Sequence, residues 1–114
     1  MTPNVVIVVQ EDPLKTGKPV EALRIALGLT SGDASVTVVL LNGALQLLNQ
    51  DTDDIVDSEI LEQYLPSIKQ LGMTFLVLHD AASTSSIDPE FQVRRVSDGD
   101  IKDLILTADR ALVF

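Results

Sequence analysis

The sequence predicts a three-layer α/β/α sandwich built on a mainly parallel, five-stranded sheet. Four short segments are almost entirely apolar and rich in Val and Leu, and helical patterns lie between them. Short apolar runs suit strands that are covered on both faces, and strands that alternate with helices are typical of a parallel sheet. The four runs are VVIVV (5–9), VTVVLL (36–41), TFLVL (74–78) and ALVF (111–114).

A fifth strand is expected at QVRRV (92–96), where apolar and polar residues alternate. This alternation is typical of a half-exposed strand and favours a position at an edge of the sheet. The chain has 114 residues. A chain of this size buries roughly 65% of the surface that it exposes when unfolded. We therefore expect residues 1–114 to form a single domain.

The first helix is expected to begin near Pro19, because proline fits the first helical turn, where its missing N–H leaves no bond unmade. The segment Ser31-Gly32-Asp33 should end this helix and turn the chain into the next strand. One face of the helix would carry Val20, Leu23, Ala26, Leu27 and Thr30. After the second strand, a short helical stretch should run from Asn42 to about Asn49.

A longer helix is expected to begin at Asp57 or Ser58, whose side-chain oxygens can cap its free N–H groups. Gly72 should end this helix, since glycine readily adopts the left-handed conformation found there. Pro66 lies inside the pattern, and an interior proline removes one backbone hydrogen bond. We therefore expect a kink or a break near Leu65.

The last helix is expected from Asp98 to Thr107, with Ser97 as its N-cap. Asp98, Asp100 and Asp103 would then lie near the positive end of the helix dipole, where negative charge is favourable. The buried stripe of this helix would contain Ile101, Leu104, Ile105 and Ala108.

Composition excludes several kinds of site and partner. The chain has 17 Asp and Glu against 8 Lys and Arg, a net charge of -9. Because binding to phosphates depends on Lys and Arg, nucleic acid and anionic membrane surfaces are not expected partners. Cysteine is absent, which excludes disulfides, thiolate zinc sites and cysteine nucleophiles. The amino-terminal segment has no basic stretch, and its apolar run is far shorter than the roughly 20 residues of a membrane span. We therefore expect a cytoplasmic protein.

Polar residues follow the predicted strands at the edge of the sheet where a binding site is expected. In open parallel sheets, ligands bind beyond the carboxyl ends of the strands. Polar residues and glycine are also what any strand needs when it leaves the core, so an ordinary set of loops remains an equally open interpretation. The candidate pocket residues are Gln10, Asn42, Gly43, His79, Asp80 and Ser83.

Catalytic and metal sites of common types are not supported by these residues. If His79 and Asp80 are both extended, their side chains point in opposite directions, so Asp80 is badly placed to orient the imidazole for attack by Ser83. The acidic run from Asp51 resembles a calcium-binding loop in its spacing. However, Ile55 and Val56 stand where such a loop needs an oxygen ligand and a glycine. Phosphate-binding and dinucleotide-binding glycine motifs are missing too, so we expect no metal and no cofactor.

The order of segments along the chain resembles the DsrE/DsrF-like family, small α/β proteins that include subunits of sulfur-relay complexes. The resemblance covers nearly the whole chain, and the "LG" turn before the third strand and the closing ADRALVF are its most family-like parts. It implies the three-layer fold, a pocket at the end of the third strand, and assembly into a homo-oligomer, a trimer or a hexamer. The segments that carry it are PVEALRIALGL, VTVVLLNGALQLL, YLPSIKQLGMTFLVLHDAASTSSI and VRRVSDGDIKDLILTADRALVF.

The same resemblance implies a function for the family and a position at which this chain departs from the family pattern. Sulfur-carrying members have a reactive cysteine at or just after the end of the third strand, and the matching positions here are Leu78 and Ala81. Neither side chain can form a persulfide. The resemblance therefore implies a non-catalytic structural subunit or small-ligand-binding module, linked to sulfur relay through cysteine-bearing partners. The alternative is an enzyme in which His79 acts as a general acid or base.

Overall fold

The computed structural model describes residues 2–79 and 87–114. Every expected strand and helix is present, and the strand boundaries agree with the predicted ones to within one residue. The elements are β1 (Asn4–Val9), α1 (Lys18–Ser31), β2 (Ser35–Leu40), the 3-10 helix η1 (Asn42–Leu48), α2 (Ser58–Leu71), β3 (Thr74–Leu78), β4 (Gln92–Val96), α3 (Asp98–Thr107) and β5 (Arg110–Val113).

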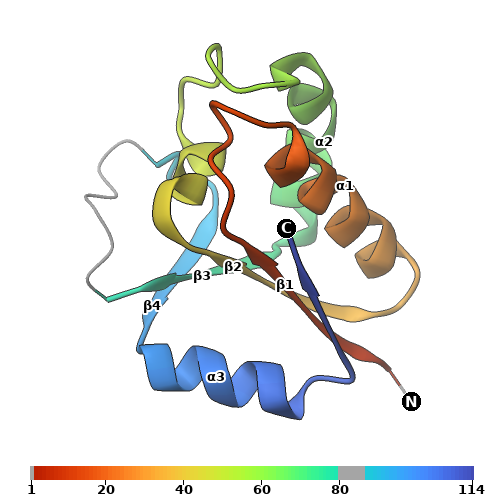
Figure 1. Ribbon diagram of the computed structural model, residues 1–114. Coiled ribbons are helices and arrows are strands. Elements are labelled where there is room, and N and C mark those ends of the chain that lie inside the picture. The colour runs from red at the N-terminus through yellow and green to blue at the C-terminus, as the bar shows by residue number, and fades with distance from the viewer. Residues whose placement is uncertain (1, 80–86) are drawn as a thin grey trace.

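The five strands form one parallel sheet in the order β4-β3-β2-β1-β5. Helices α1 and α2 cover one face of this sheet and α3 covers the other, so the chain has the predicted three-layer architecture (Figure 1). Strand β1 lies between β2 and β5, and its side chains alternate between the two faces. Val5, Ile7 and Val9 pack with α1 and α2, whereas Val6 and Val8 pack on the side of α3.

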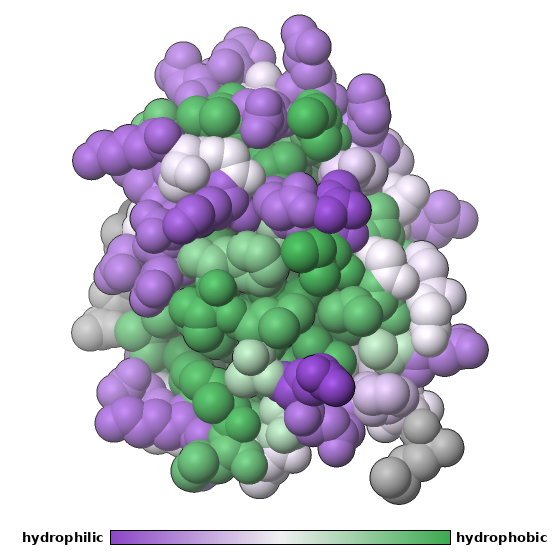
Figure 2. All heavy atoms as spheres, turned by 45° about the vertical axis from the view of Figure 1, so that its right-hand side comes forward, coloured by the Kyte–Doolittle hydropathy of each residue, from purple (hydrophilic) through white to green (hydrophobic). Residues whose placement is uncertain are grey.

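The two faces of the sheet are buried to different extents. The face under α1 and α2 contains Phe75, which is fully buried and meets Phe91 edge-on, with ring centroids 5.7 Å apart. On the opposite face, α3 is the only described helix. This side exposes three large apolar side chains, which we call the α3–β5 apolar surface: Ile105, Leu106 and Val113. Figure 2 shows a broad apolar area on the side of the molecule that includes the β5 edge.

Helix α2 differs from its prediction at two points. No break occurs near Leu65, because α2 continues through Pro66 to Leu71. Pro66 has no N–H, so one backbone carbonyl group a turn earlier in the helix lacks its hydrogen-bond donor. Because Pro66 is exposed, water can donate a hydrogen bond to that carbonyl group. Asp57 is the N-cap residue as expected, but its side chain makes no capping hydrogen bond, and its backbone is left-handed, with a φ of 63°. Gly72 ends the helix at a φ of 66°, as predicted.

Helix α3 begins with the capping arrangement that its sequence predicts. The Ser97 hydroxyl oxygen accepts the Asp100 N–H over 3.1 Å, and the Ser97 N–H donates to Asp100 Oδ2 over 3.1 Å. Ile101 is buried as expected, but Ile105 is 38% exposed, so the prediction of a buried Ile105 is wrong. The contact between α3 and the sheet is narrower than the apolar stripe of the helix.

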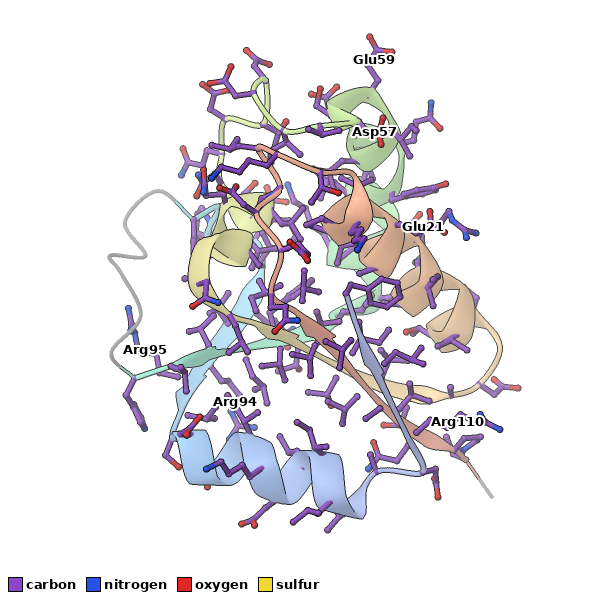
Figure 3. All side chains as sticks on the ribbon, in the orientation of Figure 1. Glu21, Asp57, Glu59, Arg94, Arg95 and Arg110 are labelled. Atoms are coloured by element: carbon purple, nitrogen blue, oxygen red, sulfur yellow. The ribbon has the colours of Figure 1, made fainter. Side chains whose placement is uncertain are left out.

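Strand β4 is an edge strand, as its alternating sequence predicts. In the described sheet it pairs with β3 alone, and Arg94 and Arg95 project from it in different directions (Figure 3). The Arg95 guanidinium donates to the carbonyl oxygens of Leu78 and His79, over 3.3 and 2.9 Å. Within residues 2–79 and 87–114, no helix is long and apolar enough to cross a membrane.

Replacing Phe75 by Ala should lower the free energy of unfolding by about 3–5 kcal/mol, because it leaves a cavity in the core and removes the contact with Phe91. Leu71→Ala is a control, since Leu71 is 48% exposed at the end of α2, and its effect should stay within about 0.5 kcal/mol. Urea denaturation at a fixed protein concentration measures both values. Equal losses in the two variants would show that the core is not centred on Phe75.

Candidate functional site

The order in which the chain adds strands to the sheet reverses at β1. From β1 the chain adds β2, β3 and β4 on one side, and β5 returns to the other side of β1. The loop after β1 is bound to the end of β5, because the Gln10 N–H donates to the Phe114 carbonyl oxygen over 2.8 Å. Ligands of open parallel sheets bind beyond the strands near such a point.

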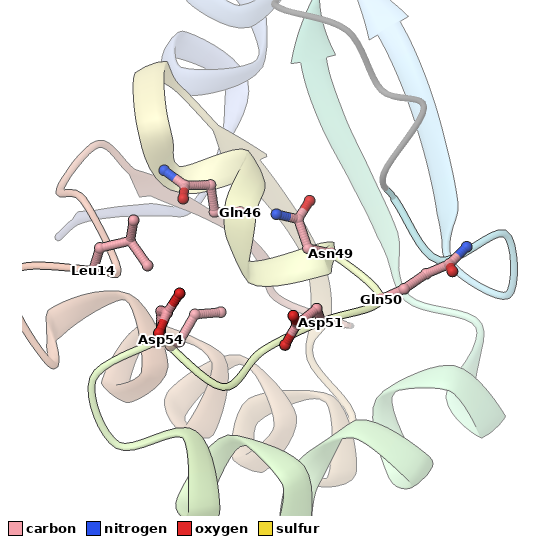
Figure 4. A pocket seen from close by; sticks show the side chains of 7 residues that line it. Leu14, Gln46, Asn49, Gln50, Asp51 and Asp54 are labelled. Carbon is pink, nitrogen blue, oxygen red and sulfur yellow. The ribbon is translucent and has the colours of Figure 1, made fainter.

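A cavity of about 470 Å³ lies beyond the ends of β1 and β2, between the loop that follows β1, the helix η1 and the segment 49–57 (Figure 4). Three amide side chains contribute to its lining, and we call it the amide cavity. Its lining residues are Leu14, Gln46, Asn49, Gln50, Asp51, Asp54 and Ile55.

Backbone hydrogen bonds hold the walls of the amide cavity together. The Val56 N–H donates to the Pro13 carbonyl oxygen over 2.9 Å, which joins the segment 49–57 to the loop after β1. The same two segments approach closely at Gly17, where an added Cβ would lie 2.5 Å from Asp57 Oδ2. A side chain at this position would therefore require the Asp57 carboxylate to move.

The lining of the amide cavity limits the ligands that it can accept. Amide groups donate and accept hydrogen bonds, and ionised carboxylates only accept them. None of the described lining residues is cationic, while Asp51 and Asp54 both contribute negative charge. The cavity therefore favours a neutral or positively charged polar ligand over an anion. Within the described part of the chain, no group of three or more His, Cys, Asp or Glu side chains could hold a metal ion.

The structure separates the residues that the sequence assigned to one pocket. Asn42 and Gly43 form the first turn of η1, but neither they nor Gln10 line the amide cavity. The amide cavity lies at the predicted edge of the sheet, and its lining residues are others than the predicted ones. The stretch Gln46 to Asp51, which reads QLLNQD, was the available signal, because it combines three amides and a carboxylate within one short segment.

His79 lies at a different cavity, of about 500 Å³, with Leu78, Val96, Ser97 and Asp98. The backbone N–H of His79 donates to the Val96 carbonyl oxygen over 3.0 Å, and the residue is exposed. Among residues 2–79 and 87–114, no side chain hydrogen-bonds its imidazole, although the Asp100 carboxylate interacts with it electrostatically. The other predicted residues of this region, Asp80, Ala81 and Ser83, lie outside the described residues.

An ion pair attaches the segment before β4 to α2. Lys69 Nζ lies 2.7 Å from Asp88 Oδ2 and 5.2 Å from the centre of the Phe91 ring. The Asp88 N–H donates to the Leu48 carbonyl oxygen over 2.8 Å, which joins the same segment to η1. The hydrogen bond between Lys69 and Asp88 raises the pKa of Lys69 and lowers the pKa of Asp88. Both groups are therefore charged over a wider pH range than in the unfolded chain.

Comparisons with known proteins agree with this architecture. The model of the DsrE/DsrF-like family matches residues 4–114. The chain belongs to the DsrE/DsrF-like family. Among solved structures, the ychN protein from E. coli is similar over 100% of both chains, with a TM-score of 0.76 and 18% sequence identity. None of the curated proteins compared with the chain matches it.

Membership of the DsrE/DsrF-like family makes the end of β3 informative. Leu78, one of the two positions predicted to match the cysteine region of the family, is half-buried at the last residue of β3. At 18% identity the solved structure establishes the fold alone, because one fold hosts many activities. The function of this DsrE/DsrF-like chain must therefore be argued from its own residues.

The Lys69–Asp88 pair should make stability depend on pH. The lowered pKa of Asp88 gives stability that is present above its unfolded value of about 3.9 and is lost as the pH falls through the folded value. The raised pKa of Lys69 gives stability that is present below its unfolded value of about 10.4 and is lost as the pH rises through the folded value. The stability difference between the native chain and Lys69→Met should therefore be largest near neutral pH and shrink at both extremes.

The matched control is Lys102→Met, because Lys102 is exposed and lies 3.6 Å from Asp98 in a surface pair. Its stability difference from the native chain should stay small and nearly constant. Chemical denaturation across the pH range measures both curves. A Lys69→Met difference that does not change with pH would contradict a stabilising role for this ion pair.

Proposed function

We propose that this DsrE/DsrF-like chain is a non-catalytic subunit that works through assembly and ligand binding and does not carry sulfur itself. The observation that supports this proposal is the absence of cysteine from the sequence. A persulfide forms on a thiolate sulfur, and neither Leu78 nor Ala81 provides one. The link to sulfur relay comes from family membership, and cysteine-bearing family members are the proposed partners.

The amide cavity supports the ligand-binding part of the proposal. It lies at the edge of the sheet where parallel α/β proteins bind ligands, and its amides and carboxylates provide both donors and acceptors. The proposed ligand of this cavity is a small neutral or cationic polar molecule. The alternative of an enzyme based on His79 is less favoured, because no described side chain hydrogen-bonds its imidazole.

The α3–β5 apolar surface supports self-assembly, which we propose to give a trimer or a hexamer. Leu106 is 81% exposed and Val113 is 61% exposed. Strand β5 pairs with β1 alone, so its outer edge carries backbone groups without a strand partner in the described sheet. An exposed edge strand beside apolar side chains is a common contact between copies of a chain.

The sulfur chemistry can be tested by mass spectrometry after incubation with polysulfide. The native chain should gain no covalently bound sulfur, because it has no thiol. Ala81→Cys, at the family position, should gain one sulfur atom more readily than Ser67→Cys, a control on the exposed side of α2. Sulfur transferred to the native chain from a persulfide-bearing partner, and retained after denaturation, would overturn the proposal.

Assembly can be tested by light scattering at several protein concentrations. The native chain should form one discrete oligomer, and the double variant Leu106→Glu with Val113→Glu should dissociate it, because buried unpaired charge is costly at an interface. Leu71→Glu, on α2, should leave the oligomer intact, and so should His79→Ala. A native chain that is monomeric and well folded at all concentrations would exclude self-assembly.

A further inference from the structure

A second cavity, of about 450 Å³, lies on the α3 side of the sheet. It is formed by strands β2, β3 and β4 together with α3, on the opposite face from α1 and α2. We call it the Arg94 cavity. Its lining residues are Thr37, Thr74, Leu76, Arg94, Val96, Asp100, Asp103 and Leu104.

The inner surface of the Arg94 cavity is apolar and already ordered. Leu76 is 4% exposed and Val96 is 9% exposed, and both belong to the core between the sheet and α3, against which Leu104 packs. Thr37 and Thr74 add hydroxyl groups from neighbouring strands. In the described part of the chain, neither hydroxyl makes a hydrogen bond to another residue, so both are available to a ligand.

The charged groups of this cavity do not neutralise one another. Arg94 projects from β4 toward α3 (Figure 3), and none of the described carboxylates lies within ion-pair distance of it. Asp100 uses one carboxylate oxygen to accept the Ser97 N–H at the start of α3. The carboxylate of Asp103 has no hydrogen-bond partner among residues 2–79 and 87–114. One cavity therefore presents a cation and an anion on different elements, both available for binding.

We propose that the Arg94 cavity binds a small zwitterion with an apolar side chain, of the α-amino acid class. The guanidinium of Arg94 would bind the carboxylate through two parallel hydrogen bonds, and Asp103 would bind the ammonium group. The apolar side chain would lie on Leu76 and Val96. A simple carboxylate would meet repulsion from Asp100 and Asp103, and a simple amine would meet repulsion from Arg94, so both charges are needed.

The ligand class can be tested by NMR titration of the full native chain with three probes of one shape. Leucine carries both charges, 4-methylpentanoate lacks the amine, and 3-methylbutylamine lacks the carboxylate. Leucine should shift the amide signals of Thr37, Thr74 and Arg94, with an affinity at least roughly tenfold above that of either other probe. No shift with leucine, or equal affinity for all three probes, would overturn the proposal.

Matched variants identify the groups responsible. Arg94→Met and Asp103→Asn should each weaken leucine binding by roughly tenfold or more. Arg110→Met and Asp98→Asn remove equivalent charges outside the cavity and should leave binding unchanged. If Arg94→Met fails to fold, Arg94→Lys, which keeps the charge without the planar fork, should still weaken binding.

Two further results would also overturn the proposal. The first is a similar loss of affinity in the control variants, which would assign the effect to overall charge. The second is a set of shifts that follows protein concentration instead of leucine concentration, which would assign this face to a second copy of the chain. The amide cavity shares no lining residue with the Arg94 cavity, so neither result bears on its proposed ligand.

Discussion

The burial of β1 on both faces is the constraint on which the rest of the structure depends. Val6, Ile7 and Val9 are fully buried, so helices must cover both sides of this strand. The parallel sheet then requires a crossover connection between successive strands, and here the described helices divide unequally between the faces. The more covered face holds the main core with Phe75. The less covered face leaves the Arg94 cavity and the α3–β5 apolar surface open, so both proposed recognition surfaces result from this unequal division.

The sequence predicts the fold well because its strongest patterns correspond to its most buried elements. The Val-rich run of β1 and the Ser97 cap of α3 each have one clear physical interpretation, and the structure confirms both. The failures occur at surface positions. Pro66 predicted a broken helix, but propensity rules do not include the packing that holds α2 together on both sides of an exposed proline. Ile105 fits the apolar stripe of α3, but the periodicity of the helix does not determine how much of that stripe the sheet can cover.

The candidate site was harder to predict than the fold, and η1 supplies the physical reason. A 3-10 helix has three residues per turn, so side chains three positions apart lie on the same side. Asn49 follows η1 as its C-cap residue, three positions after Gln46, and both residues line the amide cavity. Asn42 and Gly43 follow the strand directly and were therefore the obvious candidates, but they only start the turn. The cavity also needs the segment 49–57, whose contact with Pro13 joins residues that the sequence separates widely.

The absence of cysteine changes what this fold can be expected to do. A sulfur carrier needs one reactive atom in a shaped pocket, and that pocket is useful only while the thiol is present. Without a thiol, the proposed role depends on affinity and specificity, which come from several groups acting together. Two of the described cavities differ in their lining: the amide cavity carries amides and carboxylates, and the Arg94 cavity carries an arginine and two aspartates. Because their charges differ, the two proposed sites call for different ligands.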